Sequence, residues 1–290
     1  MLERSIERRR TIRIRRSALT AAKLDDLDRP SIKIAETLDE LLQSYRLIYA
    51  EYMEQGYIQA PHPDGLLYSV YNFLPKTCVF IFKAYLNVIS PISYTPDTEL
   101  FGLPMDSLFK QELDGLREQG RKVVEIGSLA TERSKRGKNV VMYLYKTIIN
   151  YAIFTGANDL CLMVNPKHVR FYSDIMLCEI LGEEKFYESV GAPAVAMRVN
   201  FDEYQERLKS VYGDADFETD LYSFFLKMNY SAVDPDISSL DVERNQLLDY
   251  DAARYLLLHK PDVLDKLNNR QIDYIEKKYN KALYVPSFIH

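Results

Sequence analysis

Tryptophan is missing from this 290-residue chain, and cysteine and histidine are scarce, with three and four copies. The cysteines (Cys78, Cys161 and Cys178) lie among apolar residues and have no CxxC spacing, so we expect buried, reduced thiols. The four histidines are widely scattered along the chain and form no recognisable metal-binding motif. We therefore expect neither disulfides nor a metal ion.

Long apolar runs are also missing. The most apolar stretch, residues 77–91, is interrupted by Lys83, so we expect no transmembrane helix. The N-terminus is basic but has no apolar segment of the kind found in secretory signals. A net charge of −5 and a pI near 5.6 argue against general nucleic-acid binding. Together these absences predict a cytoplasmic protein.

Basic residues nevertheless gather at the N-terminus, where residues 3–23 hold eight Lys or Arg against two Glu. A run of this kind is usually a solvated arm. It would also suit an acidic carrier protein or the anionic surface of the inner membrane. Nucleic acid is the less favoured partner, because the rest of the chain is acidic.

The most informative segment, residues 122–156, is predicted to form a buried strand, a basic loop and an amphipathic helix. Glu125 stands in the strand between Val123 and Leu129, on a face that should be at least half buried. A buried carboxylate needs a partner or a raised pKa. Glu125 is therefore either an ion-paired or strand-end residue or, as we favour, a general base in a cleft. Gly127 marks a bulge or a backbone that another group approaches closely.

The loop that follows, residues 132–139, has four basic side chains around Gly137. Asn139 is a suitable N-cap for the next helix, and Gly156 is a suitable left-handed stop. A strand that leads through such a loop to a helix N-terminus outlines a phosphate-binding site. Taken alone, the loop is better explained as a solvated basic turn. It lacks the GxxxxGK[ST] and GxGxxG patterns, so neither a nucleoside triphosphate nor a dinucleotide is indicated.

These residues resemble the GNAT acyltransferases, which carry a glutamate on the fourth strand and a loop close to R-G-x-G before a helix. The corresponding residues here are Glu125 and the segment 136–139. GNAT enzymes also have a later strand that ends in Asn, with a Tyr seven residues on. Asn165 and Tyr172 keep that spacing after a predicted strand at residues 159–164.

The segments RLIYAEYMEQGYI, EIGSLAT and NPKHVRFY are similar to the N-acyl amino acid synthases, among them the long-chain N-acyltyrosine synthases, which are relatives of the autoinducer (acyl-homoserine lactone) synthases. The resemblance covers roughly residues 33–205, a normal single-domain length. Three positions depart from the GNAT pattern: Ser134 and Asn139 in the loop, and His168 where a small residue is usual. The loop therefore fits the single phosphate of a carrier-bound phosphopantetheine better than the diphosphate of coenzyme A.

The resemblance implies an N-acyltransferase that moves a long-chain fatty acyl group from an acyl carrier protein thioester, or from acyl-coenzyme A, to the α-amine of tyrosine or another apolar amino acid. Glu125 would take a proton from the amine, directly or through a water. Backbone N–H groups between Gly127 and Leu129 would stabilise the oxyanion, and Tyr172 would protonate the leaving thiolate. His168 shares a helix face with Tyr172 and would orient the acceptor carboxylate.

No tightly bound cofactor is implied, since the phosphopantetheine thioester is a co-substrate. The residues expected to contact it are Gly127, Ser128, Leu129, Arg133, Lys135, Arg136, Gly137, Lys138, Asn139 and Asn165. The structural alternatives are that Tyr172 is an ordinary helix aromatic and that His168 is an ordinary surface residue.

Two other functions stay open. An autoinducer synthase would use S-adenosylmethionine, but those relatives usually carry N-terminal tryptophans and an acidic ExDxxD-like segment, and this chain has no tryptophan. The other alternative is a non-catalytic GNAT-fold binding module.

The alternation of predicted strands and helices indicates an α/β or α+β fold with a mixed sheet. The resemblance specifies it as an α+β (α/β-like) fold with a GNAT-type, mostly antiparallel central sheet flanked by helices. We divide the chain into a basic arm (1–30), an acyltransferase domain (31–205) and a helical C-terminal extension (206–290), with 231–236 as a joint. Strands are expected at 78–84, 87–93, 122–131, 159–164 and 194–200. Helices are expected at 35–56, 109–119, 140–156, 166–177, 203–211, 218–228, 241–258 and 271–280.

Overall fold

The computed structural model describes residue 24 and residues 26–58, 61–188, 190–213, 220–227, 232–244 and 248–279. The basic arm predicted for residues 1–30 lies almost wholly outside these ranges. Within them, no helix is long and apolar enough to cross a membrane, and no cluster of His, Cys, Asp or Glu could hold a metal ion. All three cysteines are buried thiols.

The described residues form one seven-stranded sheet in the order β1-β2-β3-β4-β5-β7-β6. Only the β4–β5 pair is parallel; every other neighbouring pair in this sheet is antiparallel. The α+β fold with a mixed, mostly antiparallel sheet is therefore confirmed. The strands are β1 (Pro30–Ile34), β2 (Cys78–Ala84), β3 (Asn87–Pro96), β4 (Val123–Gly127), β5 (Asp159–Val164), β6 (Glu179–Tyr187) and β7 (Ala192–Asn200).

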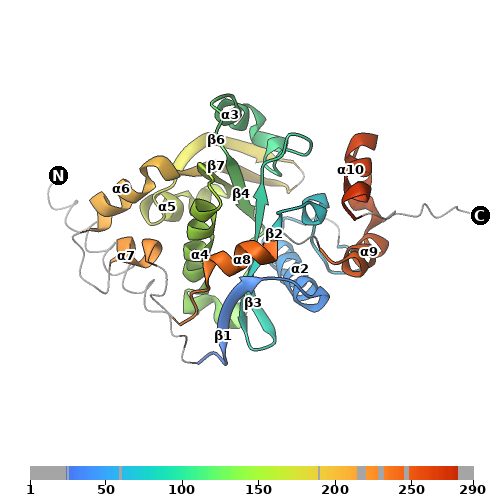
Figure 1. The fold of residues 1–290 in the computed structure, drawn as a ribbon, viewed down its shortest axis with the longest axis horizontal. Coiled ribbons are helices and arrows are strands. Elements are labelled where there is room, and N and C mark those ends of the chain that lie inside the picture. The colour runs from blue at the N-terminus through green and yellow to red at the C-terminus, as the bar shows by residue number, and fades with distance from the viewer. Residues whose placement is uncertain are drawn as a thin grey trace, which may run out of the picture.

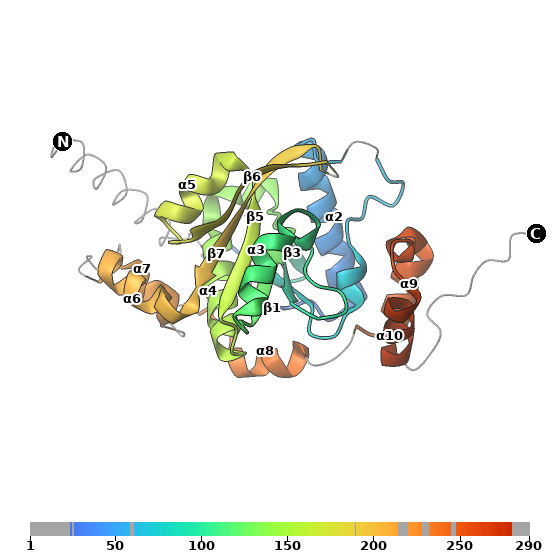
Figure 2. The same ribbon diagram turned by 90° about the horizontal axis from the view of Figure 1, so that it is seen from above.

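Helices cover both faces of the sheet (Figure 1; Figure 2). On one face α4 packs with α5 to α8, and on the other α2 covers β2 and β3 while α3 covers β4 to β7. The outermost helices, α9 and α10, lie beside α2. The helices are α2 (Leu38–Glu54), α3 (Asp106–Glu118), α4 (Val140–Phe154), α5 (Pro166–Asp174), α6 (Phe201–Tyr212), α7 (Leu221–Leu226), α8 (Ile237–Arg244), α9 (Tyr250–His259) and α10 (Asn269–Tyr279).

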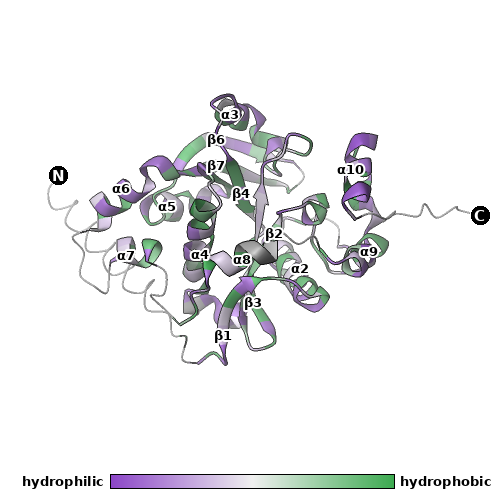
Figure 3. Ribbon diagram, viewed as in Figure 1, coloured by the Kyte–Doolittle hydropathy of each residue, from purple (hydrophilic) through white to green (hydrophobic). Residues whose placement is uncertain are grey.

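Strand alternation divides the core into layers. Phe80 and Phe82 of β2 pack in the cluster around α4, while Val79 and Ile81 of the same strand pack in the cluster that contains α2 and α9. Hydrophobic residues concentrate on the strands in Figure 3, whereas α10 is largely hydrophilic. The buried residues of α10 are Ile275 and Tyr279, which join the α2 layer.

Local signals explain several helix ends. Thr37 and Glu40 form a capping box at the start of α2. Asn165 caps α5 by accepting a hydrogen bond from the Lys167 N–H, and Pro166 occupies the first turn. Gly156 follows α4 with φ +75°, so its prediction as a left-handed stop is confirmed.

The structure corrects other expectations. Asn139 stands at the N-cap position of α4 but has φ 54°, and its side chain makes no capping hydrogen bond. The single helix expected at 241–258 is two helices, because Asp249 caps α9 through the N–H groups of Asp251 and Ala252. The joint expected at 231–236 stays a prediction; within it Val233 is buried and Asp234 is ion-paired to Lys146 of α4. Strands β1 and β6 were not predicted.

Candidate active site

Glu125 lies in the third position of β4, on the sheet face that carries α3. Its side chain is buried, with only 4% of the residue exposed, and its Oε2 accepts a hydrogen bond from the Met105 N–H at 2.8 Å. Burial is the main cause that raises the pKa of Glu125 to about 8, and the charges of Asp106 and Asp97 add to it, while the Met105 hydrogen bond opposes them. A carboxyl group with such a pKa can exchange protons near neutral pH.

The sheet opens directly after Glu125. The parallel register between β4 and β5 runs from Val123–Asp159 to Glu125–Cys161, although β4 continues to Gly127 and β5 to Val164. Each strand keeps its other neighbour beyond this point, since Gly127 pairs with Ser93 and Val164 with Val195. The two strands therefore part, and a gap opens between them.

A bulge in the backbone follows at the same place. Ser128 has φ 51°, and the chain returns to β3 when the Ala130 N–H bonds to the Pro91 carbonyl at 3.2 Å. Residues 128 and 129 thus border the gap without joining a regular ladder, as Gly127 in the sequence indicated.

Two cavities, one on each face of the sheet, meet at this gap. The first, of about 330 Å³, lies on the α2 and α3 side and contains Glu125. The second, of about 490 Å³, lies on the α4 and α5 side and contains Tyr172 and His168. Both are lined by residues of the gap: Tyr52, Tyr57, Ile126, Gly127, Ser128, Met163, Val164 and Asn165.

Tyrosine rings make up much of the first cavity's wall, and among the described residues that line it there is no Lys, Arg or His. Burial raises the pKa of Tyr52 to about 12, while a hydrogen bond with Ser128 acts in the opposite direction. The wall is thus largely uncharged and aromatic, with one titratable carboxyl group at Glu125. The tyrosines are Tyr45, Tyr52, Tyr57, Tyr68, Tyr71 and Tyr187.

In the second cavity the Tyr172 hydroxyl lies 2.5 Å from that of Tyr145 on α4, and the two rings meet edge to face. Burial raises the pKa of Tyr172 to about 12, so the phenol keeps its proton at neutral pH. His168 is exposed at the cavity rim, one turn of α5 before Tyr172. Asn165 lines both cavities and connects the end of β5 to α5.

The basic loop is a 3-10 helix, Arg133–Lys138, that leads directly into α4. Its arginines contact the acidic end of α2: Arg133 pairs with Glu54 at 2.6 Å, and Arg136 pairs with Glu51 at 2.6 Å and with Glu54 at 3.1 Å. Hydrogen bonds from both arginines lower the pKa of Glu54 to about 2. Lys135 is half-buried, and the side chain of Lys138 lies outside what the structure describes.

The structure thus brings Glu125, residues 127–129 and Asn165 to one gap, with Tyr172, His168 and Arg136 along the second cavity. Arg133 and Lys135 do not line either cavity. Sequence analysis missed Met105, which holds Glu125, and Tyr145, which holds Tyr172. It also missed the tyrosine wall, although the high tyrosine content and the tyrosines of α2 were a signal that could have been used.

Comparisons with known proteins show what the chain is similar to. The family model for the N-acyl amino acid synthase FeeM matches residues 43–200. Among solved structures, FeeM, an N-acyl amino acid synthase from uncultured soil microbes, is 26% identical with a TM-score of 0.57, and the alignment covers 64% of this chain and 99% of that one.

BjaI, a coenzyme A-dependent acyl-homoserine lactone synthase solved with S-adenosylmethionine and isopentyl-coenzyme A, is 14% identical with a TM-score of 0.51, and the alignment covers 73% of this chain and 99% of that one. At this identity it shows a shared fold alone. No curated protein matches the chain significantly. The FeeM family match spans more than half of the chain, including Glu125, Asn165 and Tyr172. The protein is therefore an N-acyltransferase with a GNAT-type fold, and it belongs to the N-acyl amino acid synthase FeeM family.

Proposed function

We propose that this enzyme transfers a long-chain acyl group from an acyl carrier protein thioester to the α-amine of tyrosine or another apolar amino acid. The observation that carries the proposal is the position of Glu125. It is a buried carboxyl group with a pKa raised to about 8, and it lies where β4 and β5 part and the two cavities meet.

The two cavities supply separate places for the two substrates. The second cavity begins beside Arg136 and Lys167 and reaches the gap, so it suits the phosphopantetheine arm of the donor. Coenzyme A is the alternative donor, and the ion pairs of Arg133 and Arg136 with Glu54 reduce the charge available for a diphosphate.

The reaction at the gap then follows from the groups present. Glu125 takes one proton from the ammonium of the acceptor, directly or through a water, and the neutral nitrogen attacks the thioester carbonyl. The second proton that the nitrogen loses on becoming an amide is released to solvent. We assign the stabilisation of the oxyanion to backbone N–H groups of residues 127–129, which border the gap. As the C–N bond forms and the C–S bond breaks, Tyr172 donates its proton to the leaving thiolate. Proton return from Glu125 to the phenolate, through solvent, resets the site.

The aromatic wall of the first cavity favours an apolar substrate group near Glu125, such as an acyl chain or an apolar side chain. Burying each additional methylene group contributes about 0.8 kcal/mol, close to a fourfold gain in affinity. Activity should therefore rise with acyl length until the available volume is filled. His168 and Lys167 lie at the rim of the second cavity, which we assign to the donor, so we assign them to the donor arm and not to the acceptor carboxylate.

The test is to incubate the purified enzyme with long-chain acyl carrier protein, or with acyl-coenzyme A of the same chain length, and all twenty amino acids, and to identify N-acyl products by mass spectrometry. We expect one or a few apolar amino acids to be acylated, with the carrier protein as the better donor. Glu125→Gln should abolish the product, while Glu184→Gln, on the exposed side of β6, should leave it unchanged.

Other outcomes assign other functions. A product formed only with coenzyme A donors corrects the donor assignment. A homoserine lactone formed from S-adenosylmethionine makes the enzyme an autoinducer synthase. Full activity in Glu125→Gln refutes the assignment of the base.

A further inference from the structure

We propose that Arg117 is the positioning residue of the catalytic base: it holds the turn that orients Glu125 and offsets the two aspartates that face Glu125. This inference rests on the proposed function, in which Glu125 is the general base. It adds a cation that neither lines the cavity nor belongs to the GNAT motifs.

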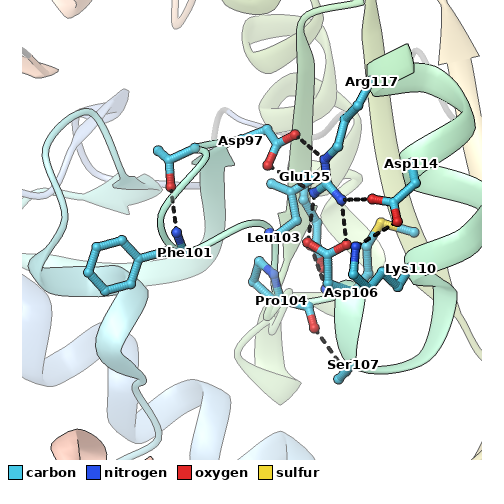
Figure 4. A network of polar contacts seen from close by, with 12 residues as sticks. Asp97, Phe101, Leu103, Pro104, Asp106, Ser107, Lys110, Asp114, Arg117 and Glu125 are labelled. Atoms are coloured by element: carbon cyan, nitrogen blue, oxygen red, sulfur yellow. Dashed lines mark hydrogen bonds and ion pairs between the residues drawn. The ribbon is translucent and has the colours of Figure 1, made fainter. Parts of the chain in front are cut away.

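Arg117, on α3, is saturated with carboxylate acceptors (Figure 4). Asp97 accepts from Nε at 2.7 Å and from Nη2 at 2.9 Å, and Asp106 accepts from Nη1 and Nη2, each at 2.7 Å. Asp114 accepts the remaining N–H of Nη1 at 2.8 Å. A guanidinium group has five N–H donors, and here each has a partner. Two of these pairs are bidentate, the strongest and most directional arrangement for arginine.

Each bidentate partner supports Glu125 from a different side. Asp106 begins α3, and its Oδ2 accepts the Leu103 N–H at 2.7 Å, which shapes the turn whose Met105 N–H reaches the Glu125 carboxyl group. Asp97 follows β3, and its own N–H bonds to the carbonyl of Val123, at the start of Glu125's strand, at 3.0 Å. Arg117 therefore joins both supports of the base.

Gly102 shows how tightly the turn is built. It has φ 64°, and a Cβ at this position would stand 2.3 Å from the Oδ2 of Asp106. The carboxylate that Arg117 holds thus lies directly against the backbone of the turn.

Arg117 is also linked to Glu125 by charge. Asp97 and Asp106 both contribute to the raised pKa of Glu125, after burial. Since no cation is found among the described residues that line the first cavity, Arg117 is the positive charge that moderates these aspartates from behind the turn. Other titratable groups also face Glu125, because its charge contributes to the raised pKa of each: Tyr52 on α2, Tyr71, and Cys161 on β5.

A purely structural ion cluster would lower stability when broken and leave the protonation of Glu125 unchanged, so the test follows that protonation directly. We would label the full-length enzyme with ¹³C-glutamate and record the carboxyl resonance that Glu125→Gln removes, as a function of pH. Arg117→Met should raise the pH of half-protonation by about one unit, a tenfold shift, and move the acidic limb of kcat/KM by the same amount. Adding Asp106→Asn to Arg117→Met should reverse most of the shift.

Arg121→Met is the matched control. Arg121 is also partly buried and forms ion pairs with Asp159 and Asp202. It lies two residues before β4, the strand that carries Glu125. It should lose comparable stability without moving the Glu125 titration. An unchanged titration in Arg117→Met overturns the proposal.

If Arg117→Met does not fold, the single variant Asp106→Asn tests whether the charges around Arg117 control the protonation of Glu125. Its side-chain oxygen can still accept from Arg117 and Leu103, but it carries no charge, so half-protonation of Glu125 should move to lower pH. No shift refutes the inference. If the wild-type enzyme forms no N-acyl product, the proposed function fails, while the titration still decides the role of Arg117.

Discussion

The hydroxyl oxygens of Tyr145 and Tyr172 lie 2.5 Å apart, so one phenol donates a hydrogen bond to the other across α4 and α5. Burial raises the pKa of both groups, which keeps both neutral near pH 7. Tyr145 therefore fixes the orientation of the one tyrosine that we assign as proton donor to the leaving thiolate.

Replacing Tyr172 with Phe should lower kcat by about 100-fold or more, because the thiolate loses its proton donor. The donor KM should change little, since the ring remains. Tyr145→Phe should have a smaller effect, because the donor stays but is less well oriented. Tyr222→Phe, on α7, serves as a control that removes a tyrosine hydroxyl away from both cavities. Steady-state kinetics with the same thioester measure all three, and an unchanged kcat in Tyr172→Phe would refute the assignment.

Glu125 should make stability depend on pH. Its carboxyl pKa is raised in the folded state from an ordinary value of 4.5 to about 8, so the folded protein holds a proton that the unfolded chain releases. The contribution of this bound proton to the free energy of unfolding is complete below pH 4.5. It is lost as pH rises to about 8, by roughly 1.4 kcal/mol per pH unit.

Urea unfolding of the wild type and of Glu125→Gln across this range measures the effect. Glutamine is neutral and can still accept a hydrogen bond from the Met105 N–H. The unfolding free energy of the wild type minus that of Glu125→Gln should therefore fall steadily as pH rises. Glu184→Gln, on the exposed side of β6, is the control for the substitution itself. A flat difference for Glu125→Gln would mean that the pKa is not raised.

The acidic end of α2 should restrain the basic loop. Replacing both Glu51 and Glu54 with Gln frees Arg133 and Arg136, and exposed pairs of this kind contribute about 0–1 kcal/mol. If the loop binds the donor phosphate, the donor KM should fall by up to about fivefold, and more at low salt than at high salt. Arg136→Ala should raise the same KM. A donor KM that responds to neither change would exclude the loop from phosphate binding.

The buried pair of Lys146 and Asp234 should anchor the C-terminal region to α4. Their atoms Nζ and Oδ2 lie 2.5 Å apart, and neither side chain is exposed. Lys146→Met leaves the aspartate charge buried, and such a loss costs about 3–5 kcal/mol. The double variant Lys146→Met/Asp234→Leu should recover much of that stability in chemical denaturation. Equal stability of the single and double variants would show that the charges do not interact strongly.

Helix α9 should support the wall of the first cavity. The Tyr68 hydroxyl donates to the Leu256 carbonyl at 2.6 Å, and the Leu256 side chain is completely buried in the α2 layer. Leu256→Ala should cost about 2–5 kcal/mol of stability and broaden the range of acyl chains or acceptors used. Leu258→Ala, two residues on and exposed, should change neither property. Unaltered selectivity in a folded Leu256→Ala enzyme would separate α9 from substrate choice.

Local pattern was sufficient for much of the fold. The predicted bounds of β2 and β5 match the structure, because each is an apolar run between turn residues. β6 escaped prediction because it is a polar strand, EILGEEKFY, at the edge of the sheet, with much of its surface exposed. The break between α8 and α9 depends on Asp249 capping, which outweighed the continuous apolar spacing.

Sequence alone therefore determined most of the order of the elements, apart from β1, β6 and the break between α8 and α9. It also determined the mixed sheet and a carboxylate in a buried strand, because these follow from periodicity and from the cost of burying charge. Tertiary structure alone decided what surrounds that carboxylate. Met105 is 20 residues from Glu125 and Tyr145 is 27 from Tyr172, and no local pattern pairs groups at such distances. The parting of β4 and β5, and the Arg117 cluster behind Glu125, likewise exist only once the strands and α3 have packed together.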